Sequence, residues 1–241
     1  MAILKNKKLV IFGTGEMGAL ARFYFEQDSP YQVVAFTADD SFVLEETFEG
    51  LPLIPFSQIE KRYPSDQFEM HVALSYRKLN LLRAEKYLAA KALGYTLASY
   101  VCSKSVYWSD LTIGDNCFIL ENQTIQPTVK IGSNVMIWSG NHIGHGSWIQ
   151  DHTYISSHVC ISGHTDIGTH CFLGVNSTLR DFVKVGNHVF VAMGAMVTRD
   201  IAEGSVVTGA KGETFAPDSK VALQLKKKYF GIEYIPSGGE R

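Results

Sequence analysis

The stretch IGSNVMIWSGNHIGHGSWIQDHTYISSHVCISGHTDI, residues 131–167, decides the fold because isoleucine returns at every sixth position in it. The same register runs from Ile113 to Val197, and each of its fifteen positions holds isoleucine, leucine or valine. A repeat of six residues is typical of a parallel β-helix in which three short strands make one turn. Fifteen repeats therefore predict five complete coils.

The fourth position of each repeat predicts the corners between strands. It holds mostly asparagine, glycine or histidine, from Asn116 to Asp200, which are residues that tolerate a positive φ. Five of the eight histidines share this position: His152, His158, His164, His170 and His188. A corner role explains them without a ligand role, so we expect no metal site. The fifth position is small or β-branched and is expected to point inward with the aliphatic residue.

One outer wall of the predicted helix is apolar. Its residues are Phe118, Leu120, Met136, Trp138, Tyr154, Phe172 and Phe190. A continuous apolar wall is not expected to stay in contact with water, so we predict that a second copy of the chain or the C-terminal segment covers it. Three-sided prisms suit a trimer.

The first hundred residues have a different pattern. Leu9–Phe12 reads as a buried strand, and Gly13-Thr14-Gly15-Glu16-Met17-Gly18 follows it and opens a predicted helix. A second strand ends at Asp39 and Asp40, where an acidic residue often holds a nucleotide ribose. A third strand is followed by Tyr76 and Arg77.

These residues predict a nucleotide site of modest size. Its candidate substrate-binding residues are Gly13, Thr14, Gly15, Asp39, Asp40, Tyr76 and Arg77. About a hundred residues are too few for both halves of a dinucleotide fold, which favours a mononucleotide or a nucleotide-linked sugar. The alternative is a glycine turn that only packs helix on strand.

Composition excludes several classes of partner. The 241 residues carry 22 Lys and Arg against 24 Asp and Glu, so no basic surplus exists for nucleic acid. No apolar run approaches the ~20 residues of a membrane helix, so we expect no membrane partner. The four cysteines form no C-x-x-C pair, and the first residues lack a signal-peptide pattern. We therefore expect a cytoplasmic protein.

The predicted fold is an α/β Rossmann-like domain followed by a left-handed parallel β-helix and a short C-terminal helix. We expect the nucleotide-sugar-binding domain at residues 1–100, the β-helix acyltransferase domain at 101–212 and the closing helix and tail at 213–241. The handedness and the acyltransferase role come from the resemblance described next. The repeat is expected to stop after Ala202.

A G-x-G-x-x-G domain that leads into an unbroken hexapeptide helix resembles the bacterial sugar acyltransferases. These include N-acetyltransferases of nucleotide-activated 4-amino sugars and sialic acid O-acetyltransferases. The most specific stretches are Trp138–His145, Ile161–His164 and Phe172–Ser177. The resemblance implies a homotrimer with acetyl-CoA bound in the crevice between neighbouring subunits.

The resemblance also implies the catalytic residues. It matches His145 to the family's general base and Gly163 to the backbone N–H donor of the oxyanion hole. His145 stands at the third position of its repeat, so the corner explanation does not cover it. The next residue is Gly146 where the family often has an acid, so the sequence does not identify the group that orients the imidazole. The implied coenzyme-binding residues are Gly163, Gly174, Asn176, Ala192, Gly194, Ala195 and Lys211.

The predicted activity is acetyl transfer from acetyl-CoA to the amino group of a nucleotide-linked amino sugar, in the synthesis of surface-glycan precursors such as lipopolysaccharide O-antigen. A sugar O-acetyltransferase is the nearest alternative. A metal-dependent hydratase that uses His158, His164 and His170 and a non-catalytic sugar-nucleotide-binding protein are two further alternatives. Nucleotide, sugar and acylated position stay open at this stage.

Overall fold

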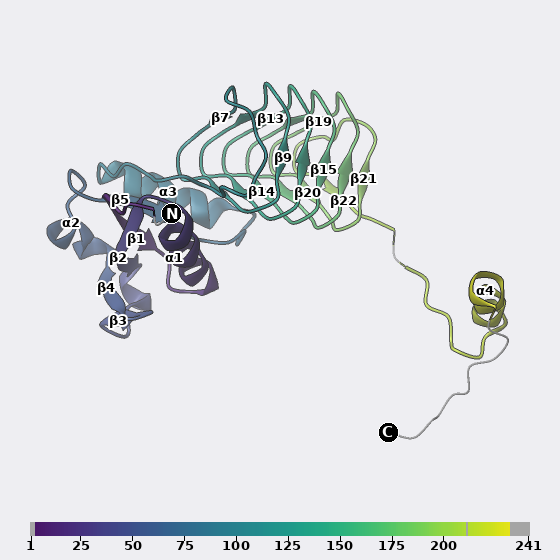
Figure 1. The fold of residues 1–241 in the computed structure, drawn as a ribbon, viewed down its shortest axis with the longest axis horizontal. Coiled ribbons are helices and arrows are strands. Elements are labelled where there is room, and N and C mark those ends of the chain that lie inside the picture. The colour runs from purple at the N-terminus through teal and green to yellow at the C-terminus, as the bar shows by residue number, and fades with distance from the viewer. Residues whose placement is uncertain (1–2, 211, 232–241) are drawn as a thin grey trace, which may run out of the picture. The chain divides into compact units, whose positions relative to one another are not determined.

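The computed structural model describes residues 3–210 and 212–231 and divides the chain into two compact units, Met1–Gly209 and Ala210–Arg241. The first unit contains both an α/β sheet and a long β-helix (Figure 1). The second unit contains the helix α4, Lys220–Phe230, which lies within the segment 213–241 where the sequence predicts a closing helix. The Ser219 hydroxyl accepts a hydrogen bond from the Ala222 N–H and caps its first turn.

The α/β part is a sheet in the order β3-β4-β2-β1-β5, parallel except for the β3–β4 pair. Its strands are β1 (Lys7–Phe12), β2 (Tyr31–Ala38), β3 (Thr47–Phe48), β4 (Leu51–Pro55) and β5 (Glu69–Val72). Its helices are α1 (Glu16–Asp28), α2 (Ile59–Arg62) and α3 (Leu81–Ala92), with short 3-10 turns at Asp40–Phe42 and Phe56–Gln58. The predicted strand, glycine turn, helix and second strand are confirmed.

Two glycines of the turn are required by close backbone contacts. A Cβ on Gly18 would lie 2.1 Å from the carbonyl oxygen of Gly13. Gly13 itself has a φ of +129°, and a Cβ there would lie 2.6 Å from the carbonyl oxygen of Ala73. The glycines therefore bring the first turn of α1 against the ends of β1 and β5, which leaves the helix N-terminus open at the sheet edge.

The β-helix consists of two-residue parallel strands that form three sheets. The first sheet, from one end to the other, contains β22 (Val206–Val207), β20 (Phe190–Val191), β17 (Phe172–Leu173), β14 (Tyr154–Ile155), β11 (Met136–Ile137), β8 (Phe118–Ile119) and β6 (Tyr100–Val101). The second contains β21 (Met196–Val197), β18 (Thr178–Leu179), β15 (Cys160–Ile161), β12 (His142–Ile143) and β9 (Thr124–Ile125). The third contains β19 (Lys184–Val185), β16 (Asp166–Ile167), β13 (Trp148–Ile149), β10 (Lys130–Ile131) and β7 (Thr112–Ile113).

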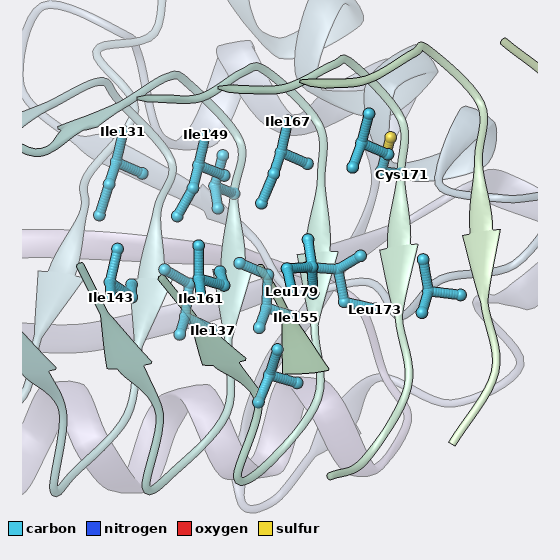
Figure 2. Close-up of a cluster of buried hydrophobic side chains, with 14 of the residues drawn as sticks. Ile131, Ile137, Ile143, Ile149, Ile155, Ile161, Ile167, Cys171, Leu173 and Leu179 are labelled. Atoms are coloured by element: carbon cyan, nitrogen blue, oxygen red, sulfur yellow. The ribbon is translucent and has the colours of Figure 1, made fainter. Parts of the chain in front are cut away.

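The six-residue register is the interior of this prism. Isoleucines such as Ile149 and Ile167 are fully buried and stack on one another from coil to coil (Figure 2). Small fifth-position residues, among them Cys117 and Ala195, fill the space between them. The fourth-position residues have positive φ from Asn116 to Gly194, which confirms the predicted left-handed corners.

The end of the helix differs from the prediction. Asp200 is not among the residues with positive φ, because the last coil is two residues shorter than the others: Ile201 bridges to Val185, sixteen residues earlier. The shortening removes a corner residue, and the repeat does not stop after Ala202. A further strand, β22, pairs with β20 and continues the first sheet.

The apolar wall is covered by the α/β part of the same unit, which corrects the predicted cover. Phe118, Leu120, Met136 and Tyr154 are each less than 5% exposed and share one buried cluster with residues of β1, α1 and β2. Trp138 and Phe172 are partly buried against that cluster, whereas Phe190 stays 38% exposed beyond it. The alternation of apolar residues showed that the wall needed a cover but not which segment supplied it.

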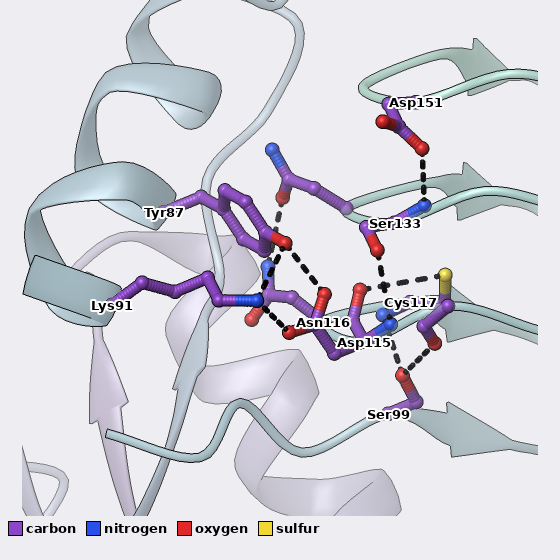
Figure 3. A network of polar contacts seen from close by, with 10 residues as sticks. Tyr87, Lys91, Ser99, Asp115, Asn116, Cys117, Ser133 and Asp151 are labelled. Atoms are coloured by element: carbon purple, nitrogen blue, oxygen red, sulfur yellow. Dashed lines mark hydrogen bonds and ion pairs between the residues drawn. The ribbon is translucent and has the colours of Figure 1, made fainter. Parts of the chain in front are cut away.

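Polar contacts also join the α/β part to the β-helix, along an interface that we call the seam. The Tyr87 hydroxyl donates to Asp115 at 2.6 Å, and Lys91 reaches the other oxygen of the same carboxylate at 2.7 Å (Figure 3). Arg83, 2% exposed, donates to the carbonyl oxygens of Asn134 and His152. Backbone carbonyls of the β-helix therefore satisfy a buried cation of α3, which fixes the two parts in one register.

His71 gives the seam a pH dependence. Its Nδ1 lies 2.9 Å from the carbonyl oxygen of Ala98, and burial lowers its pKa to about 4. A folded-state pKa below the unfolded value means that stability is lost as pH falls from about 6.5 toward 4, by about 2–3 kcal/mol. Chemical denaturation across that range measures the loss. His71→Asn is expected to reduce the slope, and an unchanged slope in this variant would assign the effect to other groups.

Candidate functional site

A cavity of about 320 Å³ lies at the carboxyl ends of β1 and β2 and at the segment after β5. Gly13, Thr14 and Gly15 line one side of it, and Asp39, Arg77 and Lys86 bring charged groups to it. The carboxyl edge of a parallel sheet beside a helix N-terminus is where phosphate-containing ligands bind. We call this the nucleotide cavity.

The two candidate ribose-binding acids have different surroundings. Asp39 lines the nucleotide cavity, and its Oδ1 forms an ion pair with the Lys86 Nζ at 2.8 Å. Asp40 is not among the lining residues; its carboxylate accepts hydrogen bonds from the Ser57 hydroxyl at 2.6 Å and from the Ser57 N–H. The structure therefore brings Asp39, and not Asp40, to the predicted ligand.

Tyr76 and Arg77 lie on an unusual turn. The next three residues, Lys78, Leu79 and Asn80, all have a left-handed φ between 51° and 68°. Such a turn persists only when its surroundings hold it. The Asn80 side chain supplies that hold, since its Nδ2 donates to the carbonyl oxygen of Cys171 at 2.9 Å and its Oδ1 accepts from Arg83 at 2.9 Å.

His145 lies exposed at a corner of the β-helix, between the second and third sheets. The Gln126 Oε1 lies 2.9 Å from the His145 backbone nitrogen and 3.0 Å from its Nδ1. A backbone N–H can only donate, so the amide oxygen faces both groups and Nδ1 carries the ring proton. Nε2 therefore keeps its lone pair and is the nitrogen able to accept a proton.

Gln126 is the orienting residue that the sequence left unidentified. It lies one coil before His145, offset by nineteen residues, at the second position of its repeat. A coil of eighteen residues brings together side chains that are about eighteen positions apart in the sequence. That spacing is the only feature of the sequence that points to Gln126.

Gly163 lies directly beside the imidazole. A Cβ at this position would meet the His145 Cε1 at 2.9 Å and Nε2 at 3.2 Å, so only glycine leaves the ring its place. Among the described residues, the Gly163 N–H takes part in no hydrogen bond. It is an unpaired backbone donor on the residue that lies against the His145 ring.

The other predicted coenzyme residues lie at a second corner, between the first and second sheets. Asn176 and Gly194 are exposed there with positive φ, Ala192 is half-buried and Gly174 is buried. The Ala195 side chain points into the prism core, fully buried, so only its backbone is near that corner. Lys211 lies outside the described residues.

The chain keeps these groups on separate edges. The α/β part bonds to the first-to-second corner through Tyr24 and Glu121, and to the third-to-first corner through Arg83 and Asn134. Among the described residues, no hydrogen bond joins it to the corner that carries His145. Within one copy of the chain, the nucleotide cavity is lined by residues of the α/β part alone, and His145 is not among them.

The corner histidines stack without forming a ligand cluster. The rings of His152, His170 and His188 follow one another at 4.6 and 4.8 Å, and burial, with the neighbouring histidines, lowers the pKa of His170 to about 4. His158, His164 and His170 lie at three different corners. Within residues 3–210 and 212–231, no three His, Cys, Asp or Glu side chains form a group suited to a metal ion.

Two family models match the coils. The model described as bacterial transferase hexapeptide (six repeats) matches residues 110–145 and 128–163, and the hexapeptide repeat of succinyl-transferase matches residues 165–199. Both matches lie within the β-helix and correspond to its six-residue repeats. No curated protein matches the chain significantly.

Solved structures share the fold of this chain. The acetyltransferase domain of PglB from Neisseria gonorrhoeae, in complex with acetyl coenzyme A, matches with a TM-score of 0.72 and 23% identity, over 87% of this chain and 100% of that one. A mutant of perosamine N-acetyltransferase from Caulobacter crescentus, in complex with CoA and GDP-perosamine, matches with a TM-score of 0.74 and 19% identity, over 86% and 97%. WeeI from Acinetobacter baumannii matches with a TM-score of 0.71 and 19% identity, over 85% and 97%.

The comparisons confirm the resemblance noted in the sequence at the level of the repeat family and of the fold. The likeness includes the α/β part as well as the hexapeptide helix, because it covers more than four-fifths of the chain. Among the described residues, no helix is long and apolar enough to span a bilayer.

Proposed function

We propose that this hexapeptide protein transfers an acetyl group from acetyl-CoA to the amino group of a nucleotide-linked sugar. The observation that carries the proposal is the exposed imidazole of His145, whose Nδ1 is held by Gln126, whose Nε2 keeps its lone pair, and whose ring lies against Gly163. The nucleotide cavity in the same unit supports a nucleotide-linked acceptor. Solved structures of this fold contain CoA together with GDP-perosamine, which supports both substrates.

The separation of the groups supports a site shared between copies. His145 and Gly163 lie at one corner, the remaining coenzyme candidates at another, and the nucleotide cavity in the α/β part. Two adjacent prisms in a closed assembly place unlike corners side by side. We therefore propose a homotrimer in which His145 of one copy serves the sugar held by the next, with acetyl-CoA along the crevice between them.

The reaction follows from these groups. The His145 Nε2 accepts a proton from the sugar amine as the amine nitrogen attacks the thioester carbonyl. The Gly163 N–H donates to the oxyanion of the tetrahedral intermediate. The C–S bond then breaks, the amide carbonyl re-forms, and the imidazolium returns its proton to the departing CoA sulfur. No metal enters these steps.

Gln126→Ala is expected to reduce kcat by about 10- to 100-fold, because the imidazole loses the acceptor that fixes its tautomer and ring position. Gln126→Glu keeps an oxygen acceptor at the same place and is expected to recover most of the activity. Both variants are measured at saturating acetyl-CoA. Equal loss in the two variants would contradict a positioning role for the Gln126 oxygen.

Thiol release from acetyl-CoA, measured with UDP-, dTDP- and GDP-linked amino sugars and with their hydroxyl counterparts, tests the proposed function. Turnover of at least one amine, with an amide product, is expected. Turnover of hydroxyl acceptors alone would replace N-acetylation by O-acetylation. No turnover with any acceptor would reject an acetyl-transfer role and leave a binding role.

We propose that the protein acts in the cytoplasm, where nucleotide-linked precursors of surface glycans are made.

A further inference from the structure

A second, larger cavity of about 850 Å³ opens beside the nucleotide cavity. Gly15, Leu74, Ser75 and Arg77 line both cavities, so the two adjoin at the glycine turn. On its far side the second cavity is lined by Tyr76, Trp138 and Tyr154. It therefore lies between the α/β part and the first sheet of the β-helix.

The aromatic residues of this cavity form a connected surface. The rings of Tyr154 and Phe172 are stacked at 5.3 Å with an interplanar angle of 9°. The Tyr76 ring packs edge-on against Tyr154 at 5.1 Å, and the Trp138 Nε1–H donates to the Tyr154 hydroxyl. Tyr76 is half exposed and Trp138 partly buried, so both have surface left for a ligand.

Residues of the α/β part support the aromatic surface on the side away from the cavity. The Arg83 guanidinium lies 5.9 Å from the centre of the Tyr154 ring, on the side of the seam. The left-handed turn at Lys78–Asn80 fixes the backbone after Tyr76 through the Asn80 side chain. A site held this way is formed before the ligand arrives, which is the usual state of small-molecule pockets.

We propose that this second cavity is the glycosyl subsite, in which Trp138, Tyr154 and Tyr76 select the sugar of the nucleotide-linked acceptor. The inference rests on the proposed function. A nucleoside in the first cavity places its diphosphate at the glycine turn, and the next group along the molecule then enters the second cavity. Hexose rings have apolar C–H faces that pack on aromatic rings, while their hydroxyls need hydrogen-bond partners.

The charged and polar groups suit such a ligand. Arg77 lines both cavities and is placed to contact a phosphate oxygen at their junction. The Tyr154 hydroxyl accepts from Trp138, and among the described residues no partner takes its own proton. It is therefore available to donate to a sugar oxygen. Trp138 thus contributes to recognition of the acceptor.

The test compares binding of a nucleoside diphosphate with binding of its amino-sugar conjugate by calorimetry on the full chain. UDP, dTDP and GDP and their 4-amino-sugar conjugates are the probes, and the pair that binds is carried forward. Trp138→Ala and Tyr76→Ala are each expected to weaken conjugate binding about tenfold and to leave diphosphate binding within twofold of wild type. Trp108→Ala, at an exposed tryptophan outside both cavities, is the matched control.

The outcomes separate the two proposals. If Tyr76→Ala, on an exposed turn, keeps full conjugate affinity, the glycosyl subsite is overturned while the proposed function stands. Equal weakening of diphosphate and conjugate also overturns it, because the aromatic residues would then serve the nucleotide. If wild type binds no nucleoside diphosphate and no conjugate, the nucleotide-linked acceptor itself is rejected, and the subsite with it.

Discussion

His145→Ala is expected to lower kcat for acetyl transfer by about 10²- to 10⁴-fold, the usual contribution of a general base. The imidazole is exposed at a corner. The backbone N–H of residue 145, which bonds to Gln126, is kept in the variant, so removal of the side chain is expected to leave the coils intact. Affinity for the nucleotide-linked acceptor is expected to stay unchanged, because the nucleotide cavity lies in the α/β part.

A corner histidine serves as the matched control. His188→Asn replaces a histidine of positive φ by a residue that adopts the same conformation, and it lies at a different corner from His145. It is expected to keep near wild-type activity. Activity of His145→Ala within a few-fold of wild type would show that another group removes the proton.

Gly18→Ala is expected to have the largest effect on stability, about 4 kcal/mol, because the added Cβ would lie 2.1 Å from the Gly13 carbonyl oxygen and only backbone movement relieves it. The displaced turn also lines the nucleotide cavity, so diphosphate binding is expected to be lost. Chemical denaturation and calorimetry measure the two effects.

Gly15→Ala is the control for this substitution. It lies three residues earlier in the same turn, and a Cβ there meets no atom within 4 Å. Its free energy of unfolding is expected to change by less than about 1 kcal/mol. Equal destabilisation by the two substitutions would show that loop flexibility, and not the close approach of α1 to β1, makes glycine necessary.

The sequence predicted most of the fold because every six-residue unit carries the same two signals, one for the interior and one for the corner. An aliphatic residue every six positions specifies the interior, and asparagine, glycine or histidine three residues later specifies a left-handed corner. The cover of the apolar wall was predicted incorrectly. Packing between an outer wall and a separate sheet depends on contacts that no sequence period records.

The site was less predictable than the fold. His145 stood out because it is a histidine away from the corner position, but Gln126 became visible only once the coil placed it beside Nδ1. The turn at Lys78–Asn80 could not be foreseen, since lysine and leucine do not favour positive φ and long-range bonds from Asn80 hold it. Adjacent aspartates also gave no signal that Ser57 would bond Asp40 and leave Asp39 at the cavity.

The crystal structure of the assembled protein with CoA and the nucleotide-linked amino sugar that it acetylates tests the central claim most directly. We expect the His145 Nε2 within hydrogen-bond distance of the sugar amine, the CoA sulfur within reach of the same nitrogen, and the nucleotide in the cavity of the adjacent copy. An imidazole remote from both the amine and the sulfur would contradict the account.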